Sequence, residues 1–135
     1  MIDIENEVFT RVAKVLREKF EGVKVYGDEG SRIIATFPAV TLVETDNAAY
    51  ERTMTSDLAE NHVELLYTAN VYSNKTSGKK AECKAIMAEI NEVLTGLGFV
   101  RTSCQPVANL QDGTIYRMTA RFTAVVSKTQ RINRG

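Results

Sequence analysis

The chain has 135 residues, of which 44% are hydrophobic and 25% charged, and its formal net charge is zero. This length and composition are typical of one globular domain with a hydrophobic core. Zero net charge argues against sequence-independent nucleic-acid binding, and no apolar run approaches the ~20 residues of a membrane span.

The N-terminal segment and the two cysteines both suit a protein of the cytoplasm. The segment Met1–Glu5 is acidic and lacks the basic start of a signal peptide, so we expect a protein made and kept in a cytoplasm. Cys83 and Cys104 fall on a predicted helix and a predicted strand, and we interpret both as small buried hydrophobic residues; a disulfide would form only if the helix and the strand bring them together. Neither has a Cys or His at metal-ligand spacing, so we expect no zinc site and no cofactor.

Charge is distributed unevenly along the chain. Residues 1–64 carry 13 acidic and 7 basic side chains, whereas residues 65–135 carry 4 and 10. If the halves separate in space, an acidic side of one copy can meet the basic side of the next and close a ring. The alternative is that both halves interleave in one sheet and the asymmetry averages out.

The first predicted element is a helix over Asp3–Phe20, ended by Gly22. Acidic residues near its start and basic residues near its end suit the helix dipole. A short strand over Val23–Tyr26 and a turn over Gly27–Ser31 follow. The apolar stripe of the helix comprises Ile4, Val8, Val12, Leu16 and Phe20, widened by Phe9 and Val15.

Phe37–Glu44 reads as a strand opened by Pro38, a residue that favours a strand start or an edge. The polar stretch Asp46–Glu60 reads as a loop, and a loop this long is often functional. The alternatives are a partner-binding arm and a solvated connector, partly a hairpin extension. As an arm it would present Tyr50, Arg52 and Met54.

Asn61–Tyr72 alternates as a strand does, with one face on a core and one largely open. A polar turn precedes an amphipathic helix, with Thr76 or Ser77 as N-cap and Gly98 as the left-handed stop. Its apolar stripe is Cys83, Ile86, Met87, Ile90, Val93, Leu94 and Leu97.

A further strand over Phe99–Val107 and the hairpin signal Asp112-Gly113 lead into a long last strand, Ile115–Val126. Its even-numbered residues are expected to face inward, and its odd-numbered residues outward. The outward mixture of Arg117, Arg121, threonines and valines suits a surface that meets a partner, although β-branched residues also simply favour strands. Together these elements predict an α+β fold, a small mixed and mostly antiparallel sheet with two main helices on one face.

No pattern indicates catalysis. The single histidine, His62, has no partner motif. Glu44 and Asp46 could share a strand face, but two carboxylates alone are weak evidence for chemistry. The cluster Lys75, Lys79, Lys80 and Lys84 surrounds a helix start, where it is either an anion site or a solvated helix end. The basic residues after 128 form a tail expected to be flexible, which leaves 1–128 as a single domain.

The order of these elements nevertheless resembles that of a known protein family. A Phe-Pro strand ending Val43-Glu44-Thr45-Asp46-Asn47 is followed by a strand ending Val71-Tyr72-Ser73-Asn74, a Lys-rich helix start, Gly98-Phe99 and Tyr116-Arg117-Met118. Over residues 1–128 this pattern is similar to the tail terminator proteins of long-tailed bacteriophages, also called tail completion or minor capsid proteins.

That resemblance implies a virion structural protein rather than an enzyme. It implies a homohexameric ring at the head-proximal end of the tail, which caps the tail tube, ends its elongation and offers a docking surface to the head. The implied partners are copies of the chain, the tube protein, the head–tail connector proteins and, in contractile tails, the sheath. No membrane and no specific nucleic acid are implied, although DNA passes through such a ring.

The alternative roles are a head-side stopper or adaptor and, more distantly, a small ligand-binding α+β domain. The candidate interface residues are Tyr50, Arg52, Met54, Lys75, Lys79, Lys80, Arg117 and Arg121.

Overall fold

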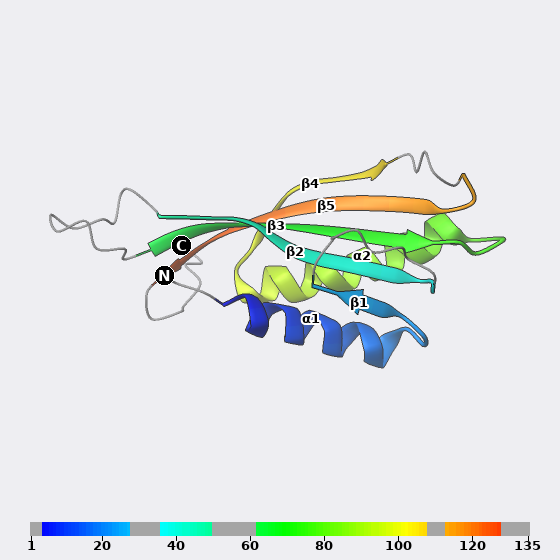
Figure 1. Ribbon diagram of the computed structural model, residues 1–135, viewed down its shortest axis with the longest axis horizontal. Coiled ribbons are helices and arrows are strands. Elements are labelled where there is room, and N and C mark those ends of the chain that lie inside the picture. Colours follow the sequence, from blue (N-terminus) through cyan, green and yellow to red (C-terminus); the bar gives the residue numbers. More distant parts are fainter. Residues whose placement is uncertain (1–3, 28–35, 50–61, 108–112, 128–135) are drawn as a thin grey trace, which may run out of the picture.

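A five-stranded sheet with two helices on one face makes up the described part of the chain (Figure 1). The computed structural model describes residues 4–27, 36–49, 62–107 and 113–127. The elements are α1 (Glu5–Lys19), β1 (Lys24–Tyr26), β2 (Ala39–Ala49), β3 (His62–Ser73), α2 (Lys79–Leu97), β4 (Val100–Val107) and β5 (Tyr116–Ser127).

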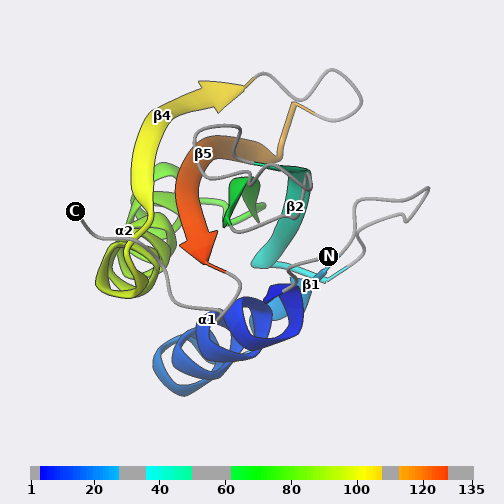
Figure 2. The same cartoon turned by 90° about the vertical axis from the view of Figure 1, so that its left-hand side faces the viewer.

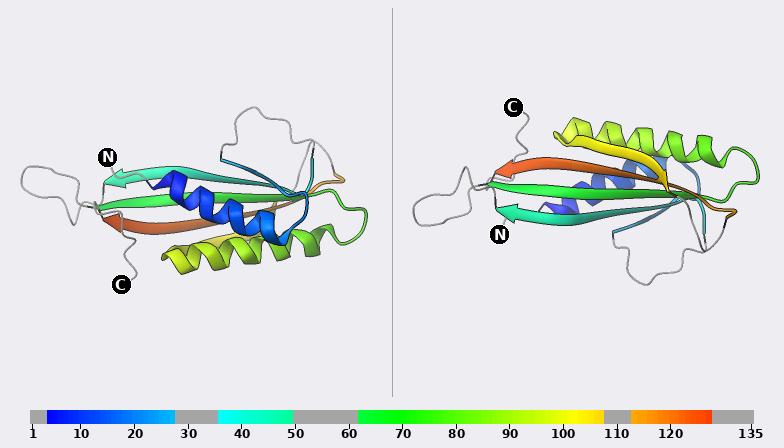
Figure 3. Two further views of the ribbon diagram at one scale, coloured as in Figure 1. Left: turned by 90° about the horizontal axis from the view of Figure 1, so that it is seen from below. Right: turned by 90° about the horizontal axis from the view of Figure 1, so that it is seen from above.

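The strand order is β1-β2-β3-β5-β4. β1 runs parallel to β2, and the other neighbouring pairs are antiparallel. Both helices lie on the same face, as the view from below in Figure 3 shows. The predicted α+β class is therefore confirmed, with a mixed and mostly antiparallel sheet.

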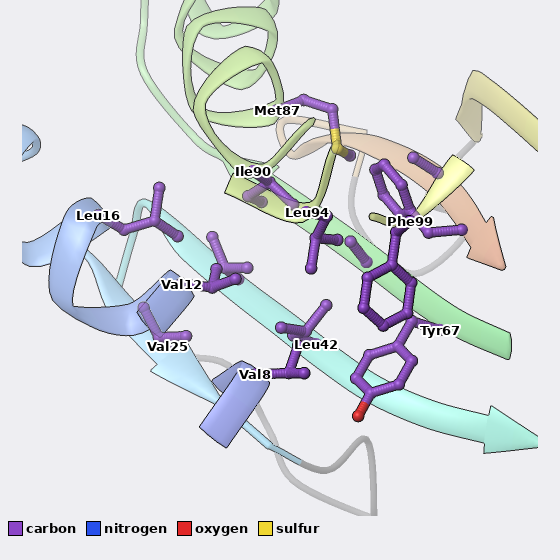
Figure 4. Close-up of a cluster of buried hydrophobic side chains, with 14 of the residues drawn as sticks. Val8, Val12, Leu16, Val25, Leu42, Tyr67, Met87, Ile90, Leu94 and Phe99 are labelled. Atoms are coloured by element: carbon purple, nitrogen blue, oxygen red, sulfur yellow. The ribbon is translucent and has the colours of Figure 1, made fainter. Parts of the chain in front are cut away.

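The core fills the space between the sheet and the helices. Figure 4 shows Val8, Val12 and Leu16 of α1 directed toward the sheet, opposite the stripe of α2. Tyr67 of β3 and Phe99 form an edge-to-face ring pair with centroids 5.1 Å apart. The inward residues predicted for β3 are all buried, namely Val63, Leu65, Tyr67, Ala69 and Val71.

Two glycines in the left-handed conformation bound α2. Gly98 has a φ of 104°, and its N–H reaches the carbonyl oxygens of Leu94 and Thr95, as predicted for a helix stop. The start differs from expectation, because the N-cap is Gly78 at φ 83° with no side-chain cap bond, not Thr76 or Ser77. The left-handed conformation costs glycine little free energy, so the chain enters the helix through a backbone turn at Gly78 and not through a side-chain hydroxyl cap.

β2 is longer than predicted. Asp46–Ala49, at the start of the stretch predicted as a loop or, in one alternative, partly a hairpin extension, pairs with residues 63–66 of β3. A register shift lies between Glu44 and Asp46, where Thr45 is the extra residue and its Oγ1 donates to the carbonyl oxygen of Leu66 at 3.1 Å. Glu44 consequently lies opposite Tyr67 and Asp46 opposite Leu66, so the two carboxylates occupy different faces and not the shared one expected.

The predicted arm residues Tyr50, Arg52 and Met54 lie outside the described residues, as does the basic tail. In the ranges that the structure does describe, neither helix has the length and apolar character needed to span a bilayer.

Candidate functional site

One face of the sheet is covered by α1 and α2, and no other described helix or strand lies over the opposite face (Figure 3, right). We call this opposite face the open face. Its residues alternate with the buried ones along β3 and β5: Glu64, Leu66, Thr68, Asn70, Tyr72, Arg117, Thr119, Arg121, Thr123 and Val125.

A polar network lies at the centre of the open face. The Asn70 Oδ1 accepts hydrogen bonds from Arg117 Nε at 3.1 Å, Arg117 Nη2 at 2.9 Å and Thr119 Oγ1 at 2.6 Å. Asn70 Nδ2 donates to Thr41 Oγ1 at 3.2 Å. Asn70 is 0% exposed and Thr41 3% exposed, so this face is not uniformly open to solvent as the alternation of β3 had suggested.

The network also fixes a cation. Arg117 is half-buried, and its guanidinium carbon lies 5.5 Å from the ring centroid of Tyr72. Because Arg117 is held by both Asn70 and Tyr72, it would lose little rotamer freedom on meeting a partner. Arg121, two residues further along β5, is exposed on the same face.

A groove opens at the β4 edge, between α2 and the inward side of β4 and β5. It has a volume of about 480 Å³. Lys80, Lys84 and Arg101 contribute its charged side chains, and no carboxylate is among the described residues that line it. The full lining is Lys80, Lys84, Met87, Ala88, Asn91, Arg101, Cys104, Gln105, Pro106, Tyr116 and Met118.

The other predicted lysines are tied to neighbours at the start of α2. Lys75 Nζ lies 3.4 Å from Glu82 Oε2, and Lys79 Nζ donates to the Thr114 carbonyl oxygen at 3.2 Å. Glu82 also accepts a 2.6 Å hydrogen bond from Ser73 Oγ, which fixes the first turn of α2 to the end of β3. These contacts give Lys75 and Lys79 local structural roles.

The two cysteines differ in environment. Cys83 is buried as predicted, and burial, with a smaller effect from Glu82, raises the pKa of its thiol to about 12. Cys104 is exposed in the groove, so its interpretation as a buried residue was wrong. The reason is that β4 is an edge strand whose inward side extends beyond the cover of α2. Both thiols are free.

The predicted interface residues thus fall into separate places. Arg117 and Arg121 share the open face, Lys80 lines the groove, and Lys75 and Lys79 sit at the start of α2. Sequence reasoning missed Asn70 and Arg101. The sequence did contain an indication for Asn70: asparagine is depleted in strand interiors, so an asparagine within a predicted strand suggests a specific hydrogen-bonding role.

Among the residues that the structure describes, no group of three or more His, Cys, Asp or Glu side chains could hold a metal ion. A comparison of the chain with models of known protein families found no match, and a comparison with curated protein sequences found none either.

Proposed function

We propose that this chain is a virion structural protein of a long-tailed bacteriophage, a tail terminator that forms a ring on the tail tube, ends its elongation and offers the head-docking surface. The element order that resembles this family motivates the proposal. The α+β architecture with helices on one face of a small mixed sheet is the fold that the resemblance implies.

The observation that carries the proposal is the strand order. β1 and β2 come from the acidic half of the sequence and lie at one edge of the sheet, whereas β5 and β4 come from the basic half and lie at the other. Figure 2 shows these two sides apart. Within the sheet, the strands of the two halves therefore do not interleave on either side of β3, which supports head-to-tail association of copies.

A ring built through the sheet edges leaves the open face of the sheet for other partners. The open face presents Arg117 and Tyr72 in a preordered arrangement, and these residue types are enriched among those that dominate binding energies. The ordered Arg117, with Arg121 beside it, suits a docking surface for the tube or the head.

The test combines the purified chain with its tail tube protein. We expect native mass spectrometry to show a hexamer that depends on protein concentration or on the tube, and electron microscopy to show shorter tubes as the chain is added. Only monomer at every ratio, with unchanged tube lengths, would refute the proposal.

A second arm separates the two virion roles. A terminator binds tails that lack heads, whereas a head-side stopper binds heads that lack tails. The variant Arg121→Glu tests the open face, since we expect it to lose docking while the ring persists.

A further inference from the structure

The groove between α2 and β4 has an unbalanced charge. Lys80, Lys84 and Arg101 surround a floor that includes Met87 and Met118, and within the described part of the chain no carboxylate lines it. A second hollow, between α1 and α2, differs because Glu18 and Glu92 there accompany Arg11 and Lys14. Uncompensated cations beside an apolar floor suit an occupant that is acidic and partly apolar.

The edge of β4 restricts how an occupant can bind. A register shift lies between Arg101 and Ser103, and Pro106 lacks the N–H that a further strand would need. Both features interrupt backbone pairing along this edge. The groove is therefore better suited to side chains presented by a folded element than to an added sixth strand. Its few cations and apolar floor also fit poorly to a nucleic-acid backbone.

A complementary element exists elsewhere in the same chain. Beyond the bulge, residues 46–49 of β2 pair with residues 63–66 of β3, which pair on their other side with residues 123–126 of β5; we call residues 46–49 and 63–66 the ribbon end. It extends past both helices in Figure 1. Asp46 and Glu64 are exposed there on the open face, close together because Asp46 pairs with Leu66 and Ala48 with Glu64.

The ribbon end and the groove cannot meet within one molecule. In the strand order, β3 and β5 separate β2 from β4. An acidic projection and a basic groove that face away from each other are the requirements for a heterologous, head-to-tail contact between copies.

We propose that the groove between α2 and β4 receives the acidic ribbon end of a second copy of this chain, with Asp46 and Glu64 facing Lys84 and Arg101. This inference rests on the proposed ring and specifies its subunit contact. The chain contains a reporter for it, since Cys104 lines the groove whereas Cys83 is buried with a raised pKa. Occupation of the groove should slow alkylation of Cys104 alone.

The experiment is a charge swap in the full chain, followed by native mass spectrometry and by the rate of Cys104 alkylation. The variant Lys84→Glu/Arg101→Glu should need at least about tenfold more protein to assemble, because like charges then face each other. The variant Asp46→Lys/Glu64→Lys should behave the same way. The chain carrying all four changes restores opposite charges and should assemble again, with Cys104 protected.

The matched control is Lys14→Glu/Arg17→Glu, which reverses one lysine and one arginine exposed on α1 and should assemble normally. A hexamer that persists in both double variants, with unprotected Cys104, overturns the contact but leaves the ring standing. Absence of any assembly by the unmodified chain, even with tube protein, overturns both. Protection of Cys104 by a short DNA duplex in the monomer would reassign the groove and overturn the proposal.

Discussion

Removing the side chain of Asn70 should destabilise the fold although Asn70 lies on the face without helices. In the variant Asn70→Ala, Arg117 and Thr119 lose an acceptor, and the nearly buried Thr41 loses a donor. Polar groups left unsatisfied in a buried place cost more than the hydrogen bond itself contributed.

The magnitude follows from these contacts. A neutral hydrogen bond contributes about 0.5–1.5 kcal/mol net and one to a charged group about 1.5–3 kcal/mol. Arg117 and Thr119 are only half-buried and regain water in the variant, so the low end of each range applies to them. We therefore expect a loss of about 2–4 kcal/mol in the free energy of unfolding, from a total that is typically about 5–15 kcal/mol.

The assay is urea unfolding followed by circular dichroism, with the slope against urea compared between variants. The exposed Asn6→Ala in α1 is the control and should change stability by less than about 0.5 kcal/mol. A double-mutant cycle with Arg117→Ala should give a coupling of about 1–2 kcal/mol. A loss for Asn70→Ala below about 0.5 kcal/mol, or additive effects in the cycle, would refute the network as a source of stability.

Three further predictions concern glycines and cysteines. Gly98→Ala should lower the free energy of unfolding by about 1–2 kcal/mol because φ is 104° there. Gly96→Ala, in open space within α2, should raise it by about 0.5–1 kcal/mol. Thermal unfolding compares the two variants, and stability changes of the same sign would contradict the reasoning. Iodoacetamide at about pH 8 should modify only Cys104 in the folded chain and both thiols after unfolding, as measured by intact mass spectrometry. Modification of both thiols in the folded protein would contradict this prediction. Because the folded pKa of Cys83 is raised to about 12, its contribution to stability is complete below the unfolded thiol's value near 9.0 and is lost as pH rises toward 12. The free energy of unfolding, measured in urea between about pH 8 and pH 11, should thus fall more steeply with pH for the unmodified chain than for Cys83→Ala. The same dependence on pH in both proteins would contradict the prediction.

The sequence was sufficient for elements whose residues repeat with a clear period. The stripe of α1 and the alternation of β3 and β5 predicted which side chains are buried, because each element buries one face against the same core. The stop of α2 at Gly98 was also predictable, since few other residues adopt a left-handed conformation at low cost.

Features that depend on neighbouring strands were not predictable. Asn70 looked like an outward polar residue, and its burial follows only once Thr41, Thr119 and Arg117 lie beside it. Cys104 was misplaced for the converse reason, because its strand turned out to be an uncovered edge. The groove brings together α2 and β4, and no local pattern specifies where their side chains meet.

The bulge at Thr45 determines on which face of the sheet the carboxylate of Asp46 lies. If Thr45 were instead paired regularly, opposite Leu66, continuous pairing would place Asp46 opposite Leu65, and an ionised carboxylate would be turned toward the apolar core. One inserted residue shifts the phase of everything that follows in β2, so that Asp46 stays outside and Asn47 takes the position opposite Leu65. Deleting Thr45 would remove the bulge and leave Asp46 opposite Leu66 as it is now, whereas forcing Thr45 into regular pairing would exchange the inward and outward faces of residues 46–49.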